Sequence, residues 1–397
     1  MTTSPSNSRT VVRAGMAIAG AAALGALGWL AARRLTPRQP DAFYSPPTFI
    51  TGANGDLLRW ERLDASWVPA NAQAWRILYV TSNIAGELTA SSAVVIAPRD
   101  VAHPSVIAWA HATSGIDPAS APSLAKTGPE SGGLYILERM LAQGWAVVAT
   151  DYPGLGTSTQ HAWLSGPPAA YAVLDSVRAA HRLPAIALDD RTVVWGYSQG
   201  GHAALWTGAL APAYASEIRL KGVFAAAPVS RPVDVIRHLA DYPAIGSTLL
   251  TSYAIVAYSR TYPDVRFDDY VRPSQRAHVR RVAANGFLTP VTIARAIVDR
   301  AARPGIFARK PDTGPLGHRL SENEATGITT TALLIAQGAA DALVPPTMQD
   351  DYVAAQRAKG QVVDYRRFDG LTHLTLMQAS SPLVPQLIEW TRERLAD

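Results

Sequence analysis

The chain has 397 residues, of which 48% are hydrophobic and 17% charged, so it is long enough to bury a large core and to carry an insertion. It contains no cysteine, which excludes disulfides, a thiol nucleophile and cysteine metal ligands. The formal net charge is +5, but residues 1–40 contain five arginines and no acidic residue, so the rest of the chain is neutral. This distribution argues against a nucleic-acid-binding surface in the body of the protein.

An uncharged apolar segment spans residues 14–32 and would reach ~28 Å as a helix, close to the hydrocarbon thickness of a bilayer. Arg9 and Arg13 precede it, as in a signal sequence. The length of the segment favours an uncleaved anchor. A cleaved signal peptide needs small residues at positions −3 and −1 of the cut, and for a cut after Ala32 position −3 is Leu30, which fits poorly. A disordered tail or a buried helix is a further alternative. We expect export, with residues 1–40 as leader and linker and membrane contact through residues 14–32.

Short apolar runs alternate with longer helical patterns over the rest of the chain, which predicts an α/β fold. The runs are rich in Val, Ile and Ala, as in strands of a parallel sheet that is buried on both faces. The predicted strands are residues 76–81, 90–96, 105–110, 145–150, 192–195, 222–226, 331–336 and 362–368. The predicted helices are residues 133–143, 169–183, 200–210, 347–358 and 385–395.

The alternation breaks between the sixth and seventh predicted strands, where helical pattern dominates. We interpret residues 231–327 as a cap inserted over the sheet, with residues 41–230 and 328–397 as the two parts of the core. The apolar stretches 244–256 and 293–298 in this insertion could line an acyl site or only pack on the core.

The candidate nucleophile is Ser198, within the sequence GYSQG at residues 196–200. This sequence fits G-x-S-x-G, and it stands between a predicted strand and a predicted helix, which is the context that this motif requires. Glycines on either side of a tightly turned serine avoid collisions between side chains. The turn would project the hydroxyl of Ser198 above the carboxyl end of the sheet.

A serine hydroxyl needs a base, and the base needs an orienting acid, which follow the serine in the order acid and then histidine. His373 lies just after the last predicted strand, and we predict that it is the base. Asp341 follows the preceding strand and is the predicted acid. Asp369 is the alternative, only four residues before His373 in the same loop.

The oxyanion that forms during acyl transfer needs two N–H donors. One is predicted to be the backbone N–H of Gln199, directly after the nucleophile. The other is predicted to come from Thr113, in the sequence HATSG that follows the third predicted strand. His111 and His202 are interpreted as structural residues.

The sequence offers no cofactor site. A G-x-G-x-x-G loop starting at Gly154 would need a glycine at position 159, where Thr159 stands. No spacing of ligands predicts a metal site. We therefore expect chemistry that uses neither a cofactor nor a metal.

Taken together, these motifs resemble the bacterial and fungal secretory lipase family. The resemblance runs from about Asp41 to the C-terminus and rests on DAFYSPP at 41–47, HATSG at 111–115, DYPGLGT at 151–157, GYSQGG at 196–201 and the turns that carry Asp341 and His373. It implies an α/β-hydrolase fold, here with a mostly parallel eight-stranded sheet and an inserted helical cap. It also implies esterase or triacylglycerol lipase activity. Fungal members carry disulfides, which this chain cannot form.

The sequence therefore predicts a carboxylic ester hydrolase that acts on acyl esters of glycerol or similar lipids through an acyl-enzyme. An acyltransferase or a peptidase would use the same triad and differ in the second step or in the bond cleaved. A non-catalytic envelope protein on a hydrolase scaffold is the third alternative, because a fold alone does not imply an activity.

Overall fold

A computed structural model describes residues 39–241, 247–284, 286 and 306–396. Nine strands form one sheet in this part of the chain, in the order β1-β2-β3-β5-β4-β6-β7-β8-β9. The strands are β1 Leu57–Arg62, β2 Ala72–Ser82, β3 Leu88–Pro98, β4 Val106–Ala110, β5 Ala146–Thr150, β6 Arg191–Tyr197, β7 Arg219–Ala226, β8 Ala332–Gly338 and β9 Asp364–Phe368. From β5 to β9 all neighbours pair in parallel, whereas β1, β2 and β3 extend the sheet by antiparallel pairing.

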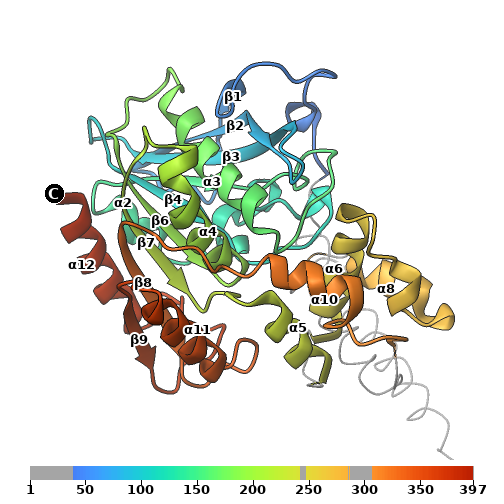
Figure 1. Ribbon diagram of the computed structural model, residues 1–397. Coiled ribbons are helices and arrows are strands. Elements are labelled where there is room, and N and C mark those ends of the chain that lie inside the picture. Colours follow the sequence, from blue (N-terminus) through green and yellow to red (C-terminus); the bar gives the residue numbers. More distant parts are fainter. Residues whose placement is uncertain (1–38, 242–246, 285, 287–305, 397) are drawn as a thin grey trace, which may run out of the picture.

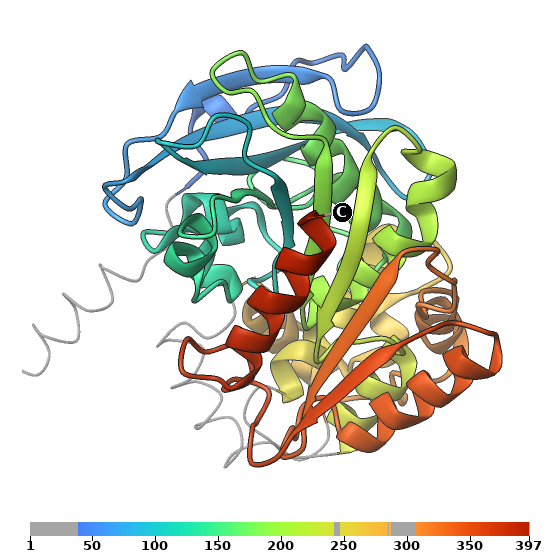
Figure 2. The same ribbon diagram turned by 90° about the vertical axis from the view of Figure 1, so that its left-hand side faces the viewer.

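Helices cover both faces of the sheet, because the central strands are apolar on both sides. In β4, Ile107 and Trp109 face one apolar cluster, whereas Val106 and Ala108 face the other. On the first face pack α2 Leu137–Leu141 and α12 Leu383–Ala396; on the second pack α3 Gly166–His181, α4 Gln199–Tyr214 and α11 Pro346–Ala358. Figure 2 shows α12 lying across the strands on the face turned toward the viewer. The order of strands and helices is that of an α/β-hydrolase fold.

All eight strands predicted from the sequence are present, but the expected count was wrong because β1 was missed. This strand, LLRWER, lies at the edge of the sheet, and its residues are exposed or half-buried. A strand with neither a buried face nor an apolar run gives no periodic signal to read. Its pairing with β2 is what holds it in the sheet.

The described residues between β7 and β8 are mainly helical, as expected. It contains α5 Pro232–Asp241, α6 Ser247–Thr261, α7 Phe267–Tyr270, α8 Arg276–Ala283 and α10 Gly314–Glu322. These helices share an apolar cluster with loops of the core: Tyr253, Ile255 and Leu316 belong to it together with Trp163 and Leu164. They gather at one end of the sheet, beyond the strands (Figure 1). The division of the chain into a core and a cap at residues 231–327 remains an interpretation.

Candidate active site

Ser198 occupies a strained turn between β6 and α4. Its backbone φ is 58° and ψ is −115°, a left-handed conformation that is costly for a residue with a side chain. A Cβ atom on Gly196 would collide with the carbonyl oxygen of Gly200, and one on Gly200 would collide with that of Ala110. The two glycines of the motif therefore leave the space in which this turn can form.

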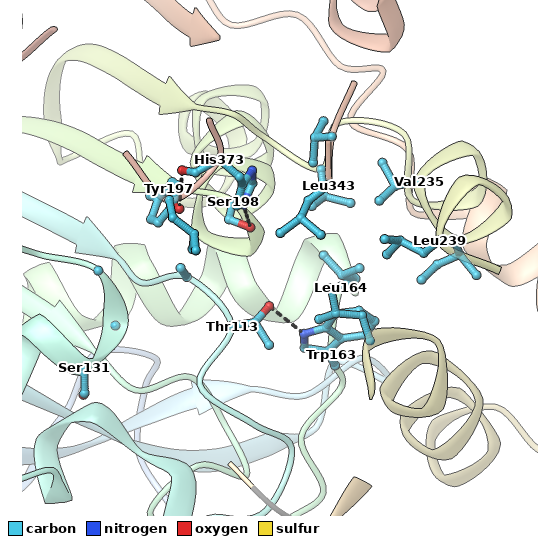
Figure 3. A pocket seen from close by; sticks show the side chains of 18 of the residues that line it. Thr113, Ser131, Trp163, Leu164, Tyr197, Ser198, Val235, Leu239, Leu343 and His373 are labelled. Atoms are coloured by element: carbon cyan, nitrogen blue, oxygen red, sulfur yellow. Dashed lines mark hydrogen bonds between the residues drawn. The ribbon is translucent and has the colours of Figure 1, made fainter. Parts of the chain in front are cut away.

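Three side chains predicted from the sequence lie in one hydrogen-bonded row. Nε2 of His373 is 2.9 Å from Oγ of Ser198 (Figure 3). Nδ1 of His373 is 2.7 Å from Oδ2 of Asp341. They come from the ends of β6, β8 and β9, which are parallel, so their carboxyl ends meet at one edge of the sheet. Since a carboxylate only accepts hydrogen bonds, Nδ1 carries the hydrogen and Nε2 is free to accept the hydroxyl hydrogen of Ser198.

The carboxylate of Asp341 is fixed by its own turn. Its Oδ1 accepts hydrogen bonds from the backbone N–H groups of Leu343 and Val344, both at 2.9 Å. Its Oδ2 also accepts one from the side-chain amide of Gln337, at 3.0 Å. The alternative acid, Asp369, is exposed in the turn after β9. Of the two predicted carboxylates, it is Asp341 that contacts the imidazole.

Two supporting residues were missed by the sequence reasoning. The hydroxyl of Tyr197 donates to the backbone carbonyl of His373 at 2.7 Å, and the two rings lie 5.2 Å apart. Gln337, at the end of β8, braces Asp341. Tyr197 fills the variable position before the serine in the motif, and nothing in its sequence context marks it. Both contacts are visible only once the strands are assembled.

The two candidate oxyanion donors lie in the expected segments. Gln199 is the first residue of α4, and Thr113 lies in the loop that follows β4. Within the described residues, no acceptor is assigned to the backbone N–H of either one. Ala112 donates its own N–H to the carbonyl of Gly132 at 2.9 Å and is not among the residues with positive φ, so the loop needs no glycine at position 112.

His111 and His202 are buried and contact backbone carbonyl groups rather than Ser198. The ring nitrogens of His111 lie 2.6 Å from the carbonyl oxygen of Ala112 and 3.1 Å from that of Asp151. Nε2 of His202 lies 2.7 Å from the carbonyl oxygen of Asn323. Burial lowers the pKa of each histidine to about 4, so both rings are neutral at pH 7. These contacts fit the structural roles predicted for them.

A mainly apolar cavity of about 80 Å³ opens onto Ser198 and His373. Core loops supply polar groups on one side, and α5 and α6 supply aliphatic side chains on the other (Figure 3). The aliphatic lining includes Val235, Ile236, Leu239, Leu250 and Leu343. Of the stretches expected to line an acyl site, Leu250 belongs to residues 244–256; residues 244–246 and 293–298 lie outside the described residues.

The described residues contain neither a metal site nor a helix that could span a membrane. No group of three His, Asp or Glu side chains there could hold a metal ion. No helix there combines the length and apolar character needed to cross a bilayer. The predicted leader segment 14–32 lies outside the described residues.

The family model for "Secretory lipase" matches residues 122–397 of the chain. The chain belongs to the secretory lipase family. One relative, a probable inactive lipase of Mycobacterium tuberculosis, is 26% identical over 389 residues, which is 92% of this chain and 84% of the relative. A secreted triacylglycerol lipase of Malassezia furfur is 28% identical over 238 residues, 57% of this chain and 44% of the relative, so the match covers less than half of that protein.

Among solved structures, lipase A of Candida antarctica in its closed state has the same fold as this secretory lipase family member. The TM-score is 0.76 at 21% identity, and the match covers 91% of this chain and 87% of that chain. The likeness confirms the α/β-hydrolase fold predicted from the sequence. The family membership expected from the motifs is likewise confirmed.

Proposed function

We propose that the protein is a carboxylic ester hydrolase that works through an acyl-enzyme. Ser198 is the nucleophile, His373 the general base and acid, and Asp341 the group that orients His373. The backbone N–H groups of Gln199 and Thr113 form the oxyanion hole. The observation that carries this proposal is the row of hydrogen bonds from Asp341 through His373 to Ser198.

In the acylation step, Oγ of Ser198 attacks the ester carbonyl carbon while Nε2 of His373 takes the hydroxyl proton. The carbonyl oxygen becomes an oxyanion, which the two backbone N–H groups stabilise. His373 then gives its proton to the leaving alkoxide, and an alcohol departs from the acyl-enzyme. Water repeats the sequence on the acyl carbonyl, releasing a carboxylic acid and restoring Ser198.

The substrates that we propose are acyl esters of glycerol or of similar lipids. The support is the aliphatic lining that α5 and α6 give to the cavity beside Ser198, since burial of an acyl chain gains about 0.8 kcal/mol per CH₂. We propose that residues 231–327 form a cap which sets the range of acyl groups. The name of the Malassezia relative, a secreted triacylglycerol lipase, agrees with this substrate class.

Two other functions compete with ester hydrolysis. The Mycobacterium relative is named a probable inactive lipase, so loss of activity is a real alternative for a member of this family. The hydrogen bonds that join Ser198, His373 and Asp341 favour hydrolysis in this chain. A protein that has lost its catalytic activity has no need to keep these three residues in contact. Acyl transfer or peptide cleavage would share the acylation step.

The test is a series of p-nitrophenyl esters from acetate to palmitate, run beside an emulsified triglyceride, on the wild type and on Ser198→Ala. We expect turnover by the wild type and a loss on the order of 10⁴-fold or more in kcat in the variant, as for other triad knockouts. Product analysis with an added alcohol separates hydrolysis from acyl transfer. A folded wild type that cleaves none of these esters would contradict the proposal.

We also propose that the protein is exported, either secreted or held at the cell envelope by residues 14–32. The support is the secretory family to which the chain belongs and the apolar leader in its sequence. Fractionation of cells that produce the full chain, followed by N-terminal sequencing of the recovered protein, distinguishes a cleaved leader from a retained anchor.

A further inference from the structure

Two residues of one loop, His161 and Trp163, each form a hydrogen bond with one of the two candidate oxyanion residues. The side chain of Gln199 contacts His161, and the hydroxyl of Thr113 accepts from Trp163. We propose that His161 and Trp163 are positioning residues that hold both halves of the oxyanion hole. This inference rests on the proposed ester hydrolysis and adds the residues that set its transition-state geometry.

The chemistry of His161 fixes the direction of its contact with Gln199. Nδ1 of His161 is 3.0 Å from the carbonyl oxygen of Pro153, which can only accept, so Nδ1 carries the hydrogen. Burial lowers the pKa of His161 to about 4, which keeps the ring neutral at pH 7 and leaves a lone pair on Nε2. The amide of Gln199 then donates to this lone pair, at 3.2 Å. The side chain of Gln199 is thereby tied to the loop while its backbone N–H remains available.

Trp163 acts in the same way on Thr113. Its indole N–H donates to Oγ1 of Thr113 at 3.2 Å, and both side chains are buried (Figure 3). An indole nitrogen is only a donor, so the hydroxyl of Thr113 must accept in this contact. The bond fixes the side chain of the residue whose backbone N–H would face the oxyanion.

The loop is itself held by helix α6 of the inserted segment. The hydroxyl of Tyr258 donates to the carbonyl of Leu164 at 3.0 Å, and the ring of Tyr253 meets that of Trp163 edge to face at 5.9 Å. Leu164 has a φ of 55°, a conformation that a leucine keeps only when its surroundings impose it. The positions of His161 and Trp163 are therefore fixed from both sides, by the core and by α6.

A donor that is displaced or mobile stabilises an oxyanion less, because the benefit depends on groups already oriented before the reaction. A small misplacement of a catalytic group costs up to about 100-fold in rate. Loss of either hydrogen bond should therefore lower kcat about 10-fold. Loss of the bond from Gln199 to His161 should also leave KM within about twofold, since His161 does not line the cavity beside Ser198, whereas Trp163 does.

The variant Trp163→Phe removes the N–H and keeps an aromatic ring against Tyr253. Thr113→Val removes the acceptor of the same bond and keeps the backbone N–H. If the hydrogen bond between Trp163 and Thr113 is what supports catalysis, the two substitutions should not be additive. The kcat of the double variant should then be no lower than that of the more damaged single variant. The matched control is Trp195→Phe, which deletes the same kind of bond, from Trp195 to Thr391 at 3.1 Å, between residues that do not line the cavity.

For the Gln199 side of the oxyanion hole, His161→Phe removes the nitrogen that accepts from the amide of Gln199. The variant keeps a ring beside Tyr152, whose ring is stacked on that of His161 at 6.0 Å. His161→Gln restores an acceptor and is expected to recover part of the lost kcat. Circular dichroism and thermal unfolding of each variant confirm that it is folded before its kinetics are compared.

The Ki of a trifluoromethyl ketone analogue of the ester tests the oxyanion hole directly, because the adduct of this inhibitor with Ser198 places an oxyanion in the hole. A residue that only supports folding would not change this Ki. Its Ki should rise in Trp163→Phe and His161→Phe by the same factor by which kcat/KM falls. The inference is overturned if the wild type is active and both folded variants keep the kcat and Ki of Trp195→Phe. A wild type that neither cleaves esters nor reacts with a fluorophosphonate overturns the proposed function and this inference with it.

Discussion

The phenolic hydroxyl of Tyr197 donates a hydrogen bond of 2.7 Å to the backbone carbonyl of His373. The residue before the nucleophile thus fixes the main chain of the residue proposed as its base. Both lie in buried surroundings, so the bond is shielded from water. The distance between Ser198 and His373 is therefore set by two contacts, one through the side chain and one through the backbone.

We expect Tyr197→Phe to lower kcat about 10-fold, because the freed loop lets the imidazole move relative to Ser198. It should also cost about 1–3 kcal/mol of stability, since a buried carbonyl loses its donor. Tyr352→Phe is the matched control: its hydroxyl donates to the carbonyl of Ala325 at 2.7 Å, away from the cavity. Steady-state kinetics and urea unfolding of both variants check this. Equal kcat values in the two would contradict it.

Asp341→Asn should reduce kcat by about 10⁴-fold, because an amide in place of the carboxylate favours the wrong tautomer of His373. Asp369→Asn, a change of the same chemistry on an exposed turn four residues before His373, should leave kcat nearly unchanged. Both variants are assayed with p-nitrophenyl butyrate. Similar losses in the two, or a greater loss at position 369, would show that the wrong carboxylate has been chosen.

Leu249 and Leu250 are neighbours in α6 and almost equally buried, but only Leu250 lines the cavity. In a cavity of about 80 Å³, we expect space to limit the length of the proposed acyl chain. Leu250→Ala should therefore raise the ratio of kcat/KM for octanoate to that for acetate, by about fourfold for each methylene newly buried. Leu249→Ala should leave the ratio unchanged. A ratio that moves equally in both variants would mean that α6 acts only through folding.

Buried neutral histidines make the fold sensitive to acid. The pKa of His202 is about 4 in the folded protein, because of burial, against 6.5 for an unperturbed histidine. Between these values the unfolded chain binds more protons, so the contribution of His202 to stability is lost as pH falls from about 6.5 toward 4.

The stability advantage of the wild type over His202→Gln should accordingly shrink across this window, by up to about 1.4 kcal/mol per pH unit. Guanidinium unfolding at pH 7, 5.5 and 4.5 measures it. In Tyr352→Phe the removed hydroxyl does not ionise in this range, since the pKa of Tyr352 is raised to about 12 by burial, so its stability difference should stay constant. A difference for His202→Gln that is independent of pH would rule out the neutral buried ring.

Much of the fold was predictable because buried strands and their flanking turns leave local signals. The residues of β4 and β5 are buried at every position and all apolar except Thr150, and each of the eight predicted strands exists. The edge strand β1 was missed because its residues are exposed or only half-buried and it is held by pairing with β2. A contact made in three dimensions leaves no pattern in the local sequence.

The residues of the candidate site also divide into those marked by a local sequence signal and those identified only by their contacts in three dimensions. Ser198, Asp341 and His373 could be chosen from motif and position, and their side chains lie within hydrogen-bonding distance of one another; their catalytic roles remain predictions. His161 and Trp163 could not be chosen, because their loop has no periodic pattern and their partners lie 38 and 50 residues away in the sequence. Their importance depends on which residues they touch.

The order in which the sheet is completed has a consequence for the timing of activity. Ser198 follows β6, whereas Asp341 and His373 follow β8 and β9, the last strands to be synthesised and the outermost on their side of the sheet. A nascent chain that has emerged only through residue 330 carries Ser198, the proposed nucleophile, without His373, its proposed base. Under the proposed mechanism, ester cleavage would therefore begin only after the last 67 residues have been made and β8 and β9 have joined the sheet.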